Sequence, residues 1–278
     1  MGMQTGSAYP ADQSFAVIRH QTELQTGLLS NCRNSKVNSL SKQVAVITGS
    51  SGGIGKAIAQ ALAARGSVVC LVGRRTETLQ AVLGAKASET GLAFCYQADL
   101  AIEHDIEKLA GKLKDEFSGV DILVHGAGVI ELSRLECASG EQLDLHYRIN
   151  LRAPYVLTRA LLPMICSRKG QIIFLNSTAG LRAGANVSQY AATKHALKAV
   201  ADSLREEVNP AGVRVLSLFL GRTATPMQAG VFAAERREYN PGILMQPEDV
   251  AEVVVNALAL SRRAEITEIS MRPAIKSY

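Results

Sequence analysis

The chain has 278 residues, of which 47% are apolar and 20% charged, and it carries a formal net charge of +5. A chain of this length can form a single α/β domain with a sizeable core, and its composition excludes collagen, coiled coils and repeat arrays. The mild positive charge comes without a run of Lys and Arg or a series of aromatic residues, which argues against a nucleic-acid partner.

Apolar runs alternate with segments of helical spacing from residue 43 onward. The predicted strands cover residues 44–48, 67–72, 92–98, 121–125, 171–176, 213–220 and 266–270. The predicted helices cover residues 53–64, 76–89, 102–117, 150–167, 188–208 and 247–261. This alternation predicts an α/β fold of one Rossmann-type domain, a doubly wound parallel sheet of about seven strands with helices on both faces. The segment 226–245 interrupts the pattern as one long connection, which we interpret as a lid.

Residues 1–42 precede the regular pattern, and the domain is expected over 43–278. Residues 1–40 are polar and contain only Asp12 and Glu23 as acidic residues. We expect a loosely ordered extension on a cytoplasmic protein, with an organellar transit peptide as the alternative, although Arg is sparse. No apolar run has the length of a membrane span.

The five cysteines are odd in number and form no C-x-x-C pair. Their scatter argues against a disulfide framework and against a zinc site, so we expect no metal.

A glycine cluster stands between the first predicted strand and the first predicted helix. Glycine allows the sharp turn and lets the backbone approach a pyrophosphate closely, while the helix start offers free N–H groups to the phosphates. An ordinary turn is the alternative, but the position between strand and helix is the one that a dinucleotide site requires. The predicted cofactor-binding residues of this turn are Gly49, Ser51, Gly52, Gly53, Ile54 and Gly55.

The end of the second strand indicates which nicotinamide cofactor binds. A site for NAD places a carboxylate there, whereas this chain has Arg74 and Arg75. A guanidinium makes two charge-assisted hydrogen bonds to a 2′-phosphate, so we predict NADP(H). Two arginines that merely cap a surface turn are the alternative. Further predicted cofactor contacts follow the third and fourth strands, at Asp99, Leu100, Ala127 and Gly128.

Tyr190 and Lys194 stand four residues apart near the start of a predicted helix, so their side chains share one face. A phenol has a pKa of about 10, and we expect the nearby ammonium and an oxidised nicotinamide to lower it toward neutrality. The Ser177 hydroxyl follows a strand and can donate to a carbonyl oxygen that gains negative charge. The Tyr and Lys spacing alone is also that of a surface pair, so the prediction depends on the combination.

In these motifs the chain resembles the short-chain dehydrogenase/reductase family, from residue 43 to about 270. The matching pieces are the turn at 48–55, Asp99, Ala127-Gly128, Asn150, Ser177, Tyr190 and Lys194. The resemblance implies that Tyr190 is the acid or base, that Ser177 polarises the carbonyl and that Lys194 binds the nicotinamide ribose and lowers the phenol pKa. It also implies that Asn150 holds a water linked to Lys194.

The resemblance further implies that the segment after the sixth strand contacts the carboxamide and diphosphate, through Gly221, Thr223 and Thr225. It implies a homodimer or homotetramer packed through the helices at 150–167 and 188–208. Where the family has Asn-Asn-Ala-Gly, this chain has His125-Gly126-Ala127-Gly128, so we expect His125 to be structural. His195 is expected to point away from the site.

Together these features predict an NADP(H)-dependent oxidoreductase that transfers a hydride between the nicotinamide and a carbonyl or secondary alcohol of a small, largely apolar substrate. One alternative is a non-catalytic NADP(H)-sensing protein, which would be expected to lose one of the three reacting side chains. Another is an epimerase or dehydratase that uses a bound nucleotide, but relatives of that kind carry a longer C-terminal portion.

Overall fold

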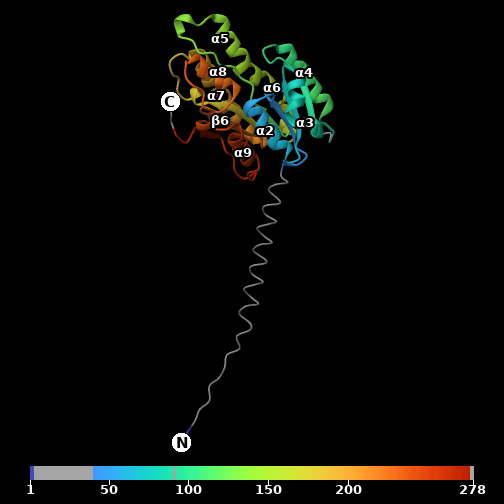
Figure 1. Ribbon diagram of the computed structural model, residues 1–278. Helices are drawn as coiled ribbons and strands as arrows, with labels where there is room; N and C mark the ends of the chain where they lie inside the picture. The colour runs from blue at the N-terminus through green and yellow to red at the C-terminus, as the bar shows by residue number, and fades with distance from the viewer. Residues whose placement is uncertain (3–39, 90–91, 276–278) are drawn as a thin grey trace. The chain divides into compact units, whose positions relative to one another are not determined.

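The computed structural model of the protein describes residues 1–2, 40–89 and 92–275 (Figure 1). Its compact unit begins at Leu40, whose side chain is buried among core residues. The predicted N-terminal extension therefore lies outside the described residues, except at its two ends.

Seven parallel strands form one sheet in the order β3-β2-β1-β4-β5-β6-β7, which confirms the predicted fold class. The strands are β1 (Val44–Thr48), β2 (Val68–Gly73), β3 (Ala93–Gln97), β4 (Ile122–His125), β5 (Gln171–Ser177), β6 (Arg214–Leu220) and β7 (Glu268–Met271). The longer helices are α2 (Gly53–Ala63), α3 (Thr76–Glu89), α4 (Glu103–Glu116), α5 (Gly140–Tyr147), α6 (Ala153–Ser167), α7 (Ser188–Val208), α8 (Pro226–Ala234) and α9 (Pro247–Leu258). Short 3₁₀ turns are η2 (Leu135–Cys137), η4 (Thr178–Gly180), η5 (Asn209–Ala211) and η6 (Pro241–Ile243).

Helices cover both faces of the sheet (Figure 1). α2 and α9 pack against each other on one face, and α4 and α6 pack against each other on the other. Successive strand residues point to opposite faces, so Ala45 and Ile47 join the core cluster with α2 and α9, while Val46 joins the one with α4, α6 and α7. Because both faces are buried, the central strands are nearly continuous apolar runs.

The strand order reverses at the carboxyl ends of β1 and β4, the switch point at which doubly wound sheets form a crevice for their ligands. The chain runs outward from β1 through β2 to β3 and then crosses back to β4 on the other side of β1. Ligands of doubly wound sheets bind where the order reverses in this way. The glycine turn follows β1 and the segment 126–128 follows β4, so both border this crevice.

Two helices differ from the sequence prediction. α5 starts at a capping box in which Ser139 Oγ accepts from the N–H of Gln142 and the Gln142 side chain accepts from the N–H of Ser139. α8 occupies the first half of the predicted long connection, with Thr225 as its N-cap and Pro226 in its first turn. The segment 226–245, predicted as one long connection, therefore contains a helix in its first half.

Two predicted element ends also differ. The helix predicted from residue 150 begins as α6 at Ala153, after a π-helical turn, η3 (Arg148–Arg152). The helix predicted to residue 261 ends at Leu258, because the Arg214 side chain binds carbonyl oxygens of 258–264 in place of further helical N–H groups.

The described part of the chain holds no helix with the length and apolar character needed to cross a bilayer. It also holds no group of three or more His, Cys, Asp or Glu side chains arranged to bind a metal ion.

Candidate active site

The glycine turn after β1 packs against the chain segment that follows β4. Gly49 has a φ of +67°, and a Cβ there would lie 2.6 Å from the Ala127 nitrogen. Thr48 Oγ1 accepts hydrogen bonds from the N–H groups of Gly126 and Ala127, at 3.1 and 3.3 Å. A Cβ on Gly126 would in turn lie 2.7 Å from the Thr48 carbonyl oxygen. These contacts require glycine at both positions and bring two predicted cofactor-binding segments together.

The start of α2 fits an anion. Gly52 is its N-cap, and no side chain of the described residues caps it, so the first N–H groups remain available. A Cβ on Gly52 would meet nothing within 4 Å, which leaves the approach to these groups open. Gly53 has a φ of +52°, and a Cβ there would lie 3.1 Å from Thr225 Cγ2. The turn and the segment after β6 therefore meet at the cradle that a pyrophosphate requires.

The two arginines follow β2 at the edge of this crevice. Both Arg74 and Arg75 are exposed, and neither forms a salt bridge within the part of the chain that the structure describes. The Gln97 side chain donates to the Arg74 carbonyl oxygen at 3.1 Å, which fixes the backbone there. Asp99 Oδ1 accepts from the N–H of Ala101 at 3.0 Å, so the Asp99 carboxylate shapes the turn after β3.

Ser177, Tyr190 and Lys194 come together at the carboxyl end of β5. Ser177 is the last residue of β5, and its hydroxyl lies close enough to Tyr190, in the first turn of α7, to lower the pKa of that phenol. Asn176 links the set, since its Oδ1 accepts from the N–H of Ser177 at 2.7 Å and its Nδ2 donates to the Lys194 carbonyl oxygen at 3.1 Å. Asn176 escaped the sequence prediction, although a polar residue at the end of an apolar strand is a usable signal.

The Lys194 side chain is buried, and its Nζ lies 5.8 Å from the centroid of the Tyr190 ring. Nζ donates to the Leu175 carbonyl oxygen at 3.0 Å, and burial lowers the pKa of Lys194 to about 8. Burial raises the pKa of Tyr190 above its ordinary value, and the nearby Ser177 hydroxyl opposes this only in part. The expectation that Lys194 and an oxidised nicotinamide together lower the phenol pKa concerns the protein with its cofactor bound, and it stays a prediction.

Asn150 lies in the π-helical turn η3, and π-turns of this kind occur often at functional sites. Its Oδ1 accepts from the N–H of Val129 at 2.8 Å, and its Nδ2 donates to the Val129 carbonyl oxygen at 2.9 Å. Nδ2 also lies 3.3 Å from Thr193 Oγ1, which donates to the Tyr190 carbonyl oxygen. Asn150 thus joins the segment after β4 to the start of α7.

Three histidines lie near the site, and they differ in burial and in contacts. His125 is buried, stacks on Phe174 and lies with Nε2 2.7 Å from Thr158 Oγ1. Burial lowers the pKa of His125 to about 3, so it stays neutral and structural, as predicted. His195 is exposed and binds a carbonyl of its own helix. His146, which the sequence prediction missed, is fully buried edge-on to the Tyr190 ring at 6.4 Å.

The segment after β6 is held by backbone contacts. Gly221 donates to the Met271 carbonyl oxygen at 2.8 Å, and Ala224 donates to the Met245 carbonyl oxygen at 2.7 Å. The Thr223 side chain is buried, and Thr225 Oγ1 accepts from the N–H of Gln228 at the start of α8. All the predicted site residues after β6 therefore lie on one anchored segment next to the glycine turn.

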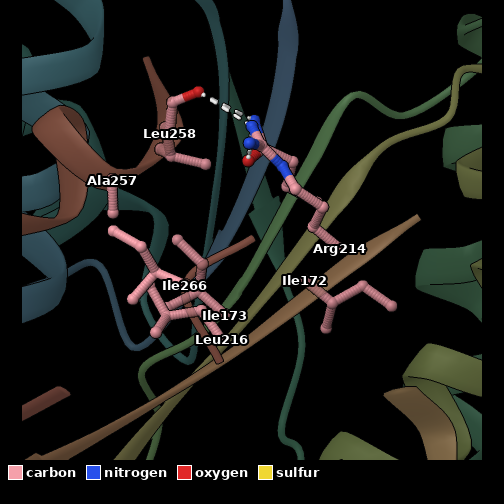
Figure 2. Close-up of a pocket in the computed structure, with 8 residues that line it drawn as sticks. Ile172, Ile173, Arg214, Leu216, Ala257, Leu258 and Ile266 are labelled. Atoms are coloured by element: carbon pink, nitrogen blue, oxygen red, sulfur yellow. Dashed lines mark hydrogen bonds between the residues drawn. The ribbon is translucent and has the colours of Figure 1, made fainter. Parts of the chain in front are cut away.

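A small cavity, drawn in Figure 2, is lined by residues at the starts of β5 and β6, at the end of the sheet opposite the candidate site. It is lined by Gln171, Ile172, Ile173, Arg214, Leu216, Ala257, Leu258 and Ile266. Arg214 Nη2 donates to Gln171 Oε1 at 2.5 Å and to the Leu258 carbonyl oxygen at 3.3 Å. The free space of about 10 Å³ is the room that one water needs, so this cavity is no substrate site.

Known proteins are similar to this chain in sequence and in fold. The family model for short chain dehydrogenase matches residues 43–236. An uncharacterized oxidoreductase of Staphylococcus epidermidis is 32% identical over 233 residues, which cover 84% of this chain and 97% of the relative. A metagenomic short-chain oxidoreductase solved in complex with NADP aligns with a TM-score of 0.72 and 31% identity, covering 84% of this chain and 99% of that chain. An alcohol dehydrogenase from the archaeon Thermococcus sibiricus, complexed with 5-hydroxy-NADP, aligns with a TM-score of 0.76 and 27% identity. The alignment covers 85% of this chain and 98% of that chain.

Proposed function

Since this chain belongs to the short-chain dehydrogenase/reductase family of oxidoreductases, we propose that it transfers a hydride between NADP(H) and a carbonyl or secondary alcohol of a small, largely apolar substrate. The observation that carries the proposal is that Ser177, Tyr190 and Lys194 lie together at the carboxyl end of β5. Oxygen donors at this end of a parallel sheet meet a ligand held in the crevice.

The cofactor would lie along the glycine turn, with its diphosphate at the start of α2 and its nicotinamide beside Lys194. The open approach at Gly52 and the uncapped helix start fit the diphosphate. Exposed Arg74, with Arg75 beside it, fits a 2′-phosphate better than a 2′-hydroxyl, because a guanidinium offers paired donors to phosphate oxygens. The NADP and 5-hydroxy-NADP in the two similar structures support the same preference.

In the direction of reduction, a bound NADPH would supply the hydride for the carbonyl carbon. Ser177 would donate a hydrogen bond to the carbonyl oxygen, which lowers the energy of the negative charge that develops there. Tyr190 would then give its phenolic proton to that oxygen, which completes the alcohol and leaves a phenolate. A raised pKa in the protein alone keeps Tyr190 protonated and ready to donate.

Lys194 and Asn150 would complete the site. With a pKa of about 8, Lys194 is largely an ammonium at neutral pH, so it can hold the ribose hydroxyls and stabilise the phenolate once the proton has left. Asn150 fixes the segment after β4 through both atoms of its amide. Through Thr193 it is also connected to the Tyr190 backbone, which suits a role in returning a proton to the phenolate by way of a bound water.

The proposal includes a homodimer or homotetramer packed through α6 and α7. Tyr155 on α6 is 52% exposed although it is a large aromatic residue, and His195 on α7 is exposed as well. An apolar side chain of this size on an outer helix favours burial against a second copy. Light scattering of the purified protein tests it, and a monomer at micromolar concentration would contradict it.

The function is tested by following NADPH absorbance with a panel of ketones, aldehydes and sugars, and by repeating the panel with NADH. We expect oxidation of NADPH with at least one apolar carbonyl compound, and much slower turnover with NADH. A protein that binds NADPH but turns over no member of the panel would favour the sensing alternative, and equal rates with both cofactors would contradict the role of Arg74.

A further inference from the structure

A cluster of charged and aromatic side chains joins the end of β6 to the far end of α8. We call Arg222, Phe232, Glu235, Arg237 and Tyr239 the Arg222 cluster. Arg222 Nη2 donates to Glu235 Oε1 at 2.6 Å, and the Arg222 guanidinium carbon lies 4.8 Å from the centroid of the Phe232 ring. The Arg222 and Glu235 side chains are 19% and 23% exposed, so the pair is largely removed from water.

The other members strengthen this contact. Arg237 Nη1 lies 3.7 Å from Glu235 Oε2, and its guanidinium carbon lies 5.4 Å from the Phe232 centroid. The Tyr239 ring meets Phe232 edge-on at 5.6 Å, and Phe232 is only 2% exposed. One buried aromatic ring thus contacts two guanidinium groups, and one carboxylate pairs with both. Cation–π contacts gain strength when desolvated, so each contact supports the others.

Backbone contacts anchor the same region at both ends. Arg222 lies between Gly221 and Thr223, two residues placed in the cofactor site above. Its carbonyl oxygen accepts from the N–H of Met245 at 3.3 Å, where the segment 226–245 ends. The segment begins directly after Thr225, whose methyl group borders the glycine turn at Gly53. The Arg222 side chain therefore ties the middle of the segment to a point where both of its ends are already fixed.

We propose that Arg222 is a positioning residue, which through Glu235 and Phe232 makes α8 and the cofactor-binding segment 221–225 move as one unit. The inference rests on the proposed function, because it assigns these residues to the NADP(H) site. A free α8 would have to be ordered when cofactor and substrate bind, and that ordering would weaken binding. The Arg222 cluster orders α8 before cofactor and substrate bind. Removing one partner of such a largely buried pair leaves the other charge unpaired, so either substitution should loosen α8 strongly.

The test uses Arg222→Met and Glu235→Gln in the full-length protein. Chymotrypsin cleaves after Phe232 and Tyr239, so cleavage there, followed by mass spectrometry without cofactor, reports how often α8 opens. We expect each variant to be cut about 10-fold faster than the wild type and to bind NADPH about 5-fold more weakly, with KM for the carbonyl substrate raised more than kcat is lowered. Arg236→Gln is the matched control, since it removes an exposed charge next to the cluster and should change neither rate nor binding by more than about 2-fold.

The double variant Arg222→Met/Glu235→Gln should open no faster than either single variant, because both remove the same interaction. Additive effects, or cleavage and NADPH binding like the wild type in both single variants, would overturn the proposal. If Arg222→Met does not fold, Arg222→Lys replaces it, since lysine retains the charge but not the planar stack on Phe232. Its cleavage rate and its NADPH affinity should then lie between those of the wild type and those of Glu235→Gln. The two proposals fail separately: cleavage that responds in a protein without NADPH binding would refute the proposed function alone, whereas normal binding with unresponsive cleavage would refute only the role of Arg222.

Discussion

Replacing Lys194 by Met should stabilise the fold at neutral pH while it removes activity. The Lys194 side chain is only 5% exposed, and burial lowers its pKa from 10.5 to about 8. At about 1.4 kcal/mol for each pKa unit, keeping the ammonium buried at pH 7 costs about 3 kcal/mol of stability. Met removes that cost and also removes the hydrogen bond to the Leu175 carbonyl oxygen, which contributes about 1 kcal/mol. The variant should therefore be about 2 kcal/mol more stable than the wild type at pH 7.

The sign of the pH dependence follows from the lowered pKa. Between pH 8 and 10.5 the unfolded Lys194 holds a proton that the folded one has lost, so the stability of the wild type rises with pH in this range. The stability of Lys194→Met lacks this rise. Its free energy of unfolding, about 2 kcal/mol above that of the wild type at pH 7, should therefore equal that of the wild type near pH 10. Urea unfolding followed by far-UV circular dichroism at pH 7, 8.5 and 10 measures both proteins.

Lys198, one turn along α7, supplies the matched control. Hydrogen bonds with Asp202 and Glu268 raise the pKa of Lys198, so its contribution to stability is present at neutral pH and is lost as the pH rises through that raised pKa. Lys198→Met should therefore be less stable than the wild type at pH 7, opposite in sign to Lys194→Met. Parallel pH profiles for the wild type and Lys194→Met would refute the reasoning about burial.

Two further predictions concern the cofactor crevice. Arg74→Ala should weaken NADPH binding by one to two orders of magnitude and leave NADH binding within about 3-fold, because only the 2′-phosphate loses its donor; isothermal titration with both cofactors measures this, and equal losses would refute the assignment. Gly126→Ala should lower the free energy of unfolding by about 1–3 kcal/mol, because its Cβ would lie 2.7 Å from the Thr48 carbonyl oxygen. Gly111→Ala on α4, where a Cβ meets nothing within 4 Å, should instead be neutral or stabilising by up to about 1 kcal/mol. Urea unfolding measures both variants, and equal urea midpoints for the two would contradict this prediction.

The sheet could be predicted because buried parallel strands are short apolar runs between turn residues. β1 was predicted with the observed ends, since Gly49 limits the run and every residue from Ala45 to Thr48 is buried. α7 was predicted over its full length for a similar reason, because its apolar residues recur at helical spacing. The doubly wound parallel class of the sheet followed from the alternation of strands and helices rather than from any single residue.

The two helices that were missed carry weak apolar patterns and strong local signals. α5 buries only His146 among its residues, so its hydrophobic spacing is faint, whereas Ser139 and Gln142 form a recognisable capping box. α8 is short and begins with Pro226 after Thr225, a combination that marks a helix start. In both cases the residues at the start of the helix, rather than its apolar spacing, are the signal that predicts it.

The site could be predicted as a set of residues but not as an electrostatic arrangement. Spacing placed Tyr190 and Lys194 on one face of α7, and the structure brings them within 5.8 Å of each other, ring centroid to Nζ. The direction of the Tyr190 pKa depends on how deeply the phenol is buried and on which oxygen the ammonium faces, and neither is visible in the spacing. Asn176 and Arg222 were missed because their partners lie on other elements.

The most direct test of the proposed chemistry is single-turnover hydride transfer in Tyr190→Phe, with NADPH bound beforehand and a carbonyl substrate from the panel. The account predicts NADPH affinity within about 3-fold of the wild type and hydride transfer slowed by about 1,000-fold or more, because the alcohol oxygen has lost its proton donor. A variant that transfers the hydride at close to the rate of the wild type would contradict it.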